Sequence, residues 1–104
     1  MKVEILTFEG CPNAESARML VERVAAESHV DVEIAHVNVP DPDTAERLHF
    51  LGSPTIRVDG HDIEPGADQR TEYVLACRIY RSEERITGVP DDRWLRDALE
   101  SSQR

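Results

Sequence analysis

Apolar residues recur along the chain with two different periods, which predicts a mixture of strands and helices. An apolar run over residues 3–8 predicts a buried strand, and the alternation of apolar and polar residues over 30–39 predicts a second. Between these segments, over residues 12–28, apolar side chains recur every three or four positions, as in an amphipathic helix. The apolar stripe of this helix consists of Ala17, Leu20, Val21, Val24 and Ala25.

The middle of the chain predicts a short helix followed by a hairpin. The prolines and aspartates of residues 40–43 stop the second strand and supply acidic residues to begin a helix over 44–50. Residues 55–58 and 61–63 are separated by Asp59-Gly60, a two-residue turn that β-hairpins prefer. The element order over this part of the chain is therefore β-α-β-α-β-β.

The stretch from residue 64 to residue 89 is longer than most loops and has no clear period. We predict a short helix within residues 68–80 and a turn-rich loop over 81–88. Pro90 and the two aspartates after it then predict the start of a last helix, which carries Trp94, Leu95, Ala98 and Leu99. We expect one domain over residues 1–104, with Tyr73, Tyr80 and Trp94 packing around that helix.

Composition and charge exclude several classes of function. The 104 residues carry a net charge of -9, which argues against nucleic acid as a partner because phosphates are bound by clustered Lys and Arg. No stretch approaches the roughly 20 apolar residues that span a bilayer, and the first residues lack the apolar core of a signal peptide. We therefore expect a cytoplasmic protein without a membrane partner, whose oligomeric state the sequence leaves open.

Cys11 is the main candidate for chemistry, because it stands between the first predicted strand and the first predicted helix. Free N–H groups at a helix start favour a thiolate, which is the nucleophilic form of cysteine, and Pro12 suits the first helical position. The carboxylates of Glu9 and Glu15 oppose a thiolate there. An unreactive structural cysteine is the alternative.

A nearby arginine would favour the thiolate of Cys11, and Arg57 and Arg78 are the candidates if the fold brings either one close. The second cysteine, Cys77, has apolar neighbours, which favours a small buried hydrophobe. A disulfide between the two cysteines is the alternative, and it requires their α-carbons to lie within about 7 Å of each other.

No resident metal or cofactor is expected. The four histidines show no ligand spacing with one another or with the cysteines, and two cysteines are too few for a disulfide scaffold. A soft cation such as Hg(II) or Cu(I) bridged by Cys11 and Cys77 is a minor hypothesis, because soft cations prefer thiolate ligands.

The element order β-α-β-α-β-β-α, the Cys11-Pro12 pair and Ser53-Pro54-Thr55 before the third strand together resemble the thioredoxin fold over nearly the whole chain. The resemblance implies an α/β fold with a central mixed four-stranded sheet and helices on both faces. It also implies that Pro54 follows a cis peptide bond, which proline makes accessible, and faces the reactive cysteine. In that family the backbone beside this proline pairs with an extended substrate.

The chain departs from the family in its redox motif, where Cys11-Pro12-Asn13-Ala14 stands in place of Cys-x-x-Cys. A single thiolate still forms a mixed disulfide, but release then needs a second thiol from glutathione, another protein or Cys77. Specificity for glutathione is not predicted, because Ser53-Pro54-Thr55 replaces the Thr-Val-Pro pattern of glutaredoxins.

The sequence therefore predicts a small thioredoxin-like monothiol protein whose partner is a protein or a low-molecular-weight thiol or disulfide. The rival hypothesis is a non-catalytic adaptor that offers its sheet edge or acidic surface to another protein, and Ala14 favours it. The candidate catalytic residues are Cys11 and Cys77, and the candidate substrate-binding residues are Pro12, Asn13, Ser53, Pro54 and Thr55.

Overall fold

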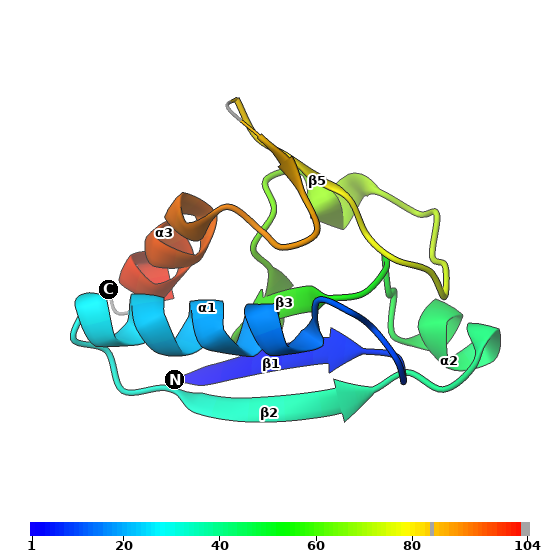
Figure 1. Ribbon diagram of the computed structural model, residues 1–104, viewed down its shortest axis with the longest axis horizontal. Coiled ribbons are helices and arrows are strands. Elements are labelled where there is room, and N and C mark those ends of the chain that lie inside the picture. The colour runs from blue at the N-terminus through cyan, green and yellow to red at the C-terminus, as the bar shows by residue number, and fades with distance from the viewer. Residues whose placement is uncertain (84, 103–104) are drawn as a thin grey trace.

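A mixed four-stranded sheet forms the centre of the computed structural model, which describes residues 1–83 and 85–102 (Figure 1). Its strands are arranged in the order β2-β1-β3-β4, with β1 parallel to β2 and antiparallel to β3. The mixed α/β class and the four-stranded mixed sheet predicted from the sequence are thus confirmed. The strands are β1 (Lys2–Thr7), β2 (Glu33–Asn38), β3 (Thr55–Val58) and β4 (His61–Asp62).

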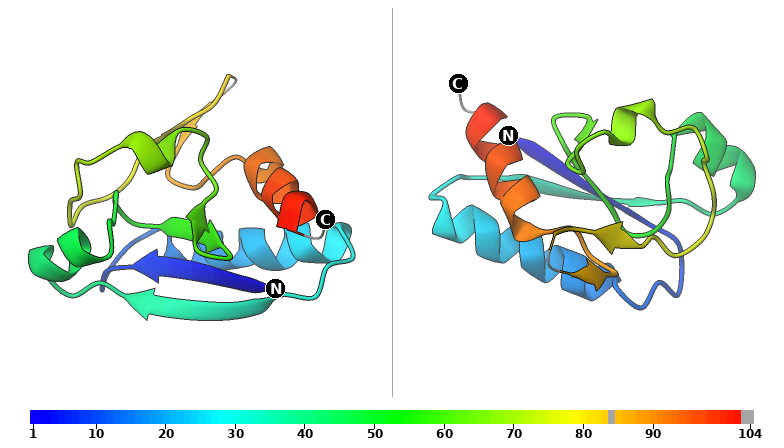
Figure 2. Two further views of the ribbon diagram at one scale, coloured as in Figure 1. Left: turned by 180° about the vertical axis from the view of Figure 1, so that it is seen from behind. Right: turned by 90° about the horizontal axis from the view of Figure 1, so that it is seen from above.

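Two of the three α-helices lie on one face of this sheet. α1 (Ala14–Glu27) runs along β1, and α3 (Asp92–Ser102) packs against both α1 and β3 (Figures 1 and 2). The short helix α2 (Pro42–Arg47) follows β2, and Asp41 caps it by accepting a hydrogen bond from the Thr44 N–H at 2.7 Å. No helix among residues 1–83 and 85–102 is long and apolar enough to cross a membrane.

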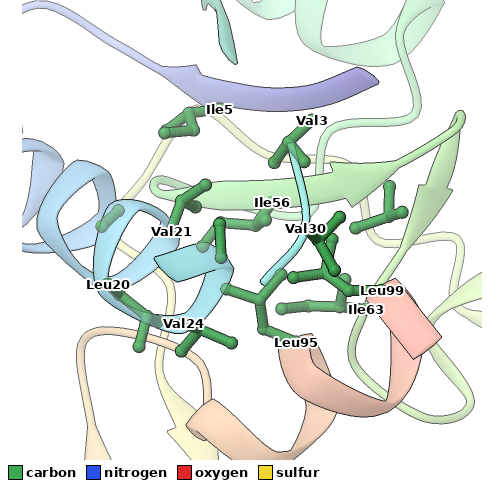
Figure 3. Close-up of a cluster of buried hydrophobic side chains, with 13 residues drawn as sticks. Val3, Ile5, Leu20, Val21, Val24, Val30, Ile56, Ile63, Leu95 and Leu99 are labelled. Atoms are coloured by element: carbon green, nitrogen blue, oxygen red, sulfur yellow. The ribbon is translucent and has the colours of Figure 1, made fainter. Parts of the chain in front are cut away.

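The core consists of two clusters, one on each face of β1. Val3 and Ile5 point toward α1 and α3, where every residue of the predicted α1 stripe is buried (Figure 3). Leu6 points to the other face because side chains alternate along a strand, and there it packs with Val39, Ala45 and Phe50 under α2. The larger cluster includes Leu20, Val21, Val24, Ile56, Leu95 and Leu99.

The helix predicted within residues 68–80 is wrong. Only a 3-10 turn, η1 (Ala67–Gln69), is present there, and the chain between it and β5 (Tyr80–Arg81) forms no helix. Residues 74–78 form no helix because their backbone groups bond to residues 50–53. The Val74 N–H donates to the Phe50 carbonyl at 2.9 Å, and the residues after Val74 pair with Ser53.

The predicted loop over residues 81–88 contains the end of a short hairpin, in which β5 pairs with β6 (Ile86–Thr87). Tyr80 and Trp94 pack together as predicted, with ring centroids 6.2 Å apart. Tyr73 instead stacks on His49 at 4.6 Å, so the prediction that it packs around the last helix is wrong.

Candidate functional site

Cys11 lies in a turn that ends before α1 begins. Its N–H donates to the Phe8 carbonyl at 3.2 Å, and its own carbonyl accepts from the Ala14 N–H at 3.4 Å. The helix therefore begins at Ala14 and not at Pro12, which is exposed. Because the effect of a helix dipole falls off within one turn, Cys11 receives less of it than the sequence predicted. The thiol is half-buried.

Asn13 occupies the N-cap position of α1, but its side chain makes no capping hydrogen bond. It lies instead against the backbone of Gly88: a β-carbon at Gly88 would stand 2.3 Å from the Asn13 side-chain nitrogen. Gly88, which follows β6, therefore lies against Asn13, and a larger residue there would displace the Asn13 side chain. Asn13 is thus in contact with another part of the chain at the position where a substrate contact was predicted.

Ser53 and Pro54 form a buried loop that leads into Thr55, the buried first residue of β3, and the Ser53–Pro54 peptide bond is cis. The Ser53 N–H donates to the Ala76 carbonyl at 2.8 Å, and the Ser53 carbonyl accepts from the Arg78 N–H at 2.9 Å. These two bonds form a parallel bridge that places Cys77 opposite Ser53. The Ser53 hydroxyl is buried and has no hydrogen-bond partner among the described residues.

The prediction that Cys77 is a buried hydrophobe is wrong, because its side chain is exposed. Side chains alternate along an extended chain, and Arg78 beside it points inward and is 3% exposed. Both cysteines are free thiols. The bridge brings Cys77 to the proline loop, which the sequence did not predict.

Arg78, a candidate partner of the Cys11 thiolate in the sequence, binds other groups in the structure. Its guanidinium bonds to Asp62 at 2.7 Å, to Glu64 at 2.6 Å and to the Thr55 hydroxyl at 2.9 Å, and it lies over the Tyr80 ring. Burial alone would lower the pKa of Arg78, but its hydrogen bond to Asp62 and the surrounding charges raise the pKa above the ordinary value. Arg78 is therefore a charged anchor inside the molecule.

Neither candidate arginine is free to act on Cys11. The carboxylates of Asp62 and Glu64 hold Arg78, and Arg57 donates to the carbonyls of Leu48 and His49. The sequence did contain a sign that Arg78 is held by carboxylates. It stands within the apolar run of residues 75–80, and a charge at a buried position needs partners.

A cavity of about 350 Å³ lies beside the loops that carry the two cysteines, although neither cysteine lines it. Phe8, whose carbonyl binds the Cys11 N–H, lies on one side of it, and Leu75, two residues before Cys77, lies on another. Glu9 adds a carboxylate to the lining. Among the described residues, no three His, Cys, Asp or Glu side chains gather in a way that would hold a metal ion.

Comparison with known proteins identifies the family. No family model and no solved structure matches the chain. The thioredoxin of Methanocaldococcus jannaschii is 35% identical over 80 residues, an alignment that covers 75% of this chain and 93% of that protein. As the resemblance implied, the chain has a mixed sheet, a cysteine between the first strand and the first helix, and a proline loop before β3. Together with this degree of identity, they show that the chain belongs to the thioredoxin family.

Proposed function

We propose that this protein carries out thiol-disulfide exchange through Cys11. The observation that carries the proposal is the position of a half-buried free thiol at the first strand-to-helix turn of a thioredoxin-family chain. The M. jannaschii relative is named a thioredoxin, and exchange chemistry at this thiol is the corresponding function for this chain.

In the first step, the Cys11 thiolate attacks one sulfur of a disulfide. The disulfide bond breaks, a mixed disulfide forms on Cys11, and the other half leaves as a thiolate. Ala14 stands where the second cysteine of the family motif would stand, so the motif holds no second thiol that could release the captured group from Cys11. Release therefore needs a thiol from elsewhere.

Cys77 is the proposed source of that thiol. It is exposed, its bridge to Ser53 holds it at the proline loop, and Leu75 and Phe8 line one cavity. Cys77 would attack the Cys11 sulfur and expel the captured thiol, which leaves a Cys11–Cys77 disulfide that an external dithiol then reduces. Pro12, which is exposed, keeps its proposed role as a residue that borders the bound group, whereas Thr55 is buried.

The experiment is to incubate the reduced protein with bis(2-hydroxyethyl) disulfide and to follow the adducts by mass spectrometry. We expect Cys11 to react faster than a cysteine in an unstructured peptide of residues 8–16, and Cys11→Ser to abolish this reaction. In Cys77→Ser the adduct on Cys11 should persist. In the wild type it should give way to a monomer that is lighter by two hydrogen atoms and has an internal disulfide.

Two results would count against the proposal in different ways. If Cys11 reacts no faster than the peptide, exchange is not the function, and the adaptor hypothesis, which the absence of a cysteine at position 14 favours, takes its place. If Cys11 reacts but the adduct is equally long-lived with and without Cys77, the protein is a monothiol that depends on an external thiol for release.

A further inference from the structure

The proline loop has no free backbone group with which to bind a partner. Between the carbonyls of Gly52 and Pro54 the backbone has four hydrogen-bonding groups, because the proline nitrogen carries no hydrogen. Ser53 bonds to residues 76 and 78 through both of its groups. The Gly52 carbonyl accepts from the Thr55 hydroxyl at 2.6 Å, and the Pro54 carbonyl accepts from the Tyr80 hydroxyl.

An extended peptide binds at the edge of a sheet by pairing with unpaired N–H and C=O groups. At Ser53 this place is taken by residues 76–78, here called the strap, which belong to the segment that connects η1 to β5 (Figures 1 and 2). A guest chain would have to remove the strap before it could pair there.

Removal of the strap would be costly, because it is anchored on the inside of the molecule. Lifting it would pull the Arg78 guanidinium away from Asp62 and Glu64, whose side chains are only 12% and 15% exposed. The approach between strap and loop is also close, since a β-carbon at Gly52 would stand 2.9 Å from that of Arg78. The strap is therefore a fixed part of the fold.

We propose that Cys11 exchanges with a low-molecular-weight disulfide that makes no strand-like pairing with the protein, and that the strap excludes extended polypeptide partners from the proline loop. This inference rests on the proposed exchange function. The cavity between Phe8 and Leu75, about 350 Å³ in volume, is of the size that small ligands occupy. The reaction is the exchange step given above, which consumes no separate oxidant or reductant.

The test compares three disulfides on the reduced wild-type protein. The first is bis(2-hydroxyethyl) disulfide, which has no peptide backbone. The second is an unstructured peptide whose single cysteine is joined to 2-hydroxyethanethiol. The third is the same peptide with methylated backbone nitrogens on both sides of that cysteine, so that it cannot donate to the Ser53 carbonyl. The rate of modification at Cys11 is measured by proteolytic mapping and mass spectrometry.

We expect the two peptides to react at rates within about threefold of each other, because strand pairing, which would separate them by roughly fivefold or more, does not occur. The small disulfide should react at least as fast as either peptide. If the unmethylated peptide reacts more than about threefold faster than the other two probes, strand pairing does occur and the inference is wrong. If none of the three reacts faster than with the free peptide of residues 8–16, the exchange function itself fails, and this inference is withdrawn with it.

Discussion

At the scale of single residues, two arginines show how burial changes the contribution of an arginine–carboxylate ion pair to stability. Arg18 on α1 pairs with Glu15 and with Glu22 at 2.7 Å, on a helix face where all three side chains contact water. Arg78 also pairs with two carboxylates, but its side chain is only 1% exposed. Exposed pairs are screened by solvent, whereas a largely buried carboxylate that loses its partner has little water to replace it.

We therefore predict that Arg78→Met lowers the free energy of unfolding by about 3 kcal/mol, the lower end of the range for breaking a buried pair, because Asp62 and Glu64 keep some contact with water. Arg18→Met is the matched control, and we expect it to have a much smaller effect. Urea unfolding at constant m-value measures both. Equal losses for the two variants would show that Arg78 is not a structural anchor.

Asp91 gives a prediction about pH. Its carboxylate accepts hydrogen bonds from the Arg93 guanidinium and from the Arg93 N–H at 2.8 Å, and these lower the pKa of Asp91 well below its ordinary 3.8. Folding thus favours the ionised form. The stabilisation is fully present above the unfolded-state pKa and is lost as the pH falls toward the lower folded-state value.

We predict that Asp91→Asn lowers stability at pH 7 by at most about 1 kcal/mol, because Arg93 is half exposed and solvent screens the pair. The difference from the wild type should shrink as the pH falls from 4 to 2, as thermal unfolding at a series of pH values would show. In a background with Arg93→Gln, the same substitution should have less effect at pH 7. A difference that stays constant down to pH 2 would contradict the assignment.

At the scale of elements, periodicity was enough to predict the segments that are buried on one face. The α1 stripe and the hairpin of β3 and β4 follow directly from it. The predicted end of the first helix, residue 28, lies within one residue of the end of α1, whereas α2 ends three residues before the predicted residue 50. Each helix is followed within two residues by a histidine with φ of 55°, His29 or His49, where glycine or asparagine is usual. In both cases the next residue donates back to the carbonyl of residue 25 or 45.

The candidate site was predicted only in part for a related reason. Cys11, Ser53 and Pro54 stand at element junctions, which local sequence marks. The strap is extended because its partner is Ser53, more than 20 positions away, and no local pattern reports such a partner. A short helix was therefore predicted within residues 68–80, and Cys77 was predicted to be a buried residue.

Gly52 permits the close approach of the proline loop and the strap, and a substitution at Gly52 tests whether this close packing stabilises the protein. Its φ is +125°, and an added β-carbon would meet Arg78 and the Ala76 carbonyl. Gly10 is the matched control, since its φ is +87° but nothing lies within 4 Å of an added β-carbon. Both Gly→Ala substitutions impose an unfavourable backbone conformation, and only the one at position 52 adds overlap.

We predict that Gly52→Ala destabilises the protein by at least about 1 kcal/mol more than Gly10→Ala, the lower end of the cost of overpacking. Urea unfolding gives this difference. Amide hydrogen exchange should also quicken at Ser53 and Arg78 in the position 52 variant alone, because the displaced strap exposes these amides. Equal effects of the two substitutions would show that the strap yields without cost.

At the scale of the whole molecule, the net charge of -9 acts on any charged partner of Cys11. The field of such a surface attracts cations and repels anions at a distance, and salt weakens it. Glu9 and Glu15 place part of this charge close to the thiol in sequence, and Glu9 lines the neighbouring cavity. The acidic composition therefore bears on which small disulfides reach Cys11.

We predict that the exchange rate at Cys11 is several-fold higher for cystamine, a dication, than for glutathione disulfide, a dianion, in low salt. Between about 10 and 200 mM salt, where the Debye length falls from about 30 Å to below 10 Å, the first rate should fall and the second should rise. Bis(2-hydroxyethyl) disulfide is uncharged and should show almost no change, which separates screening from other effects of salt on the protein. Stopped-flow or quenched mass measurements supply the three rates. If cystamine and glutathione disulfide respond to salt in the same direction, the acidic surface has no part in selecting the partner, and contacts inside the cavity must do so instead.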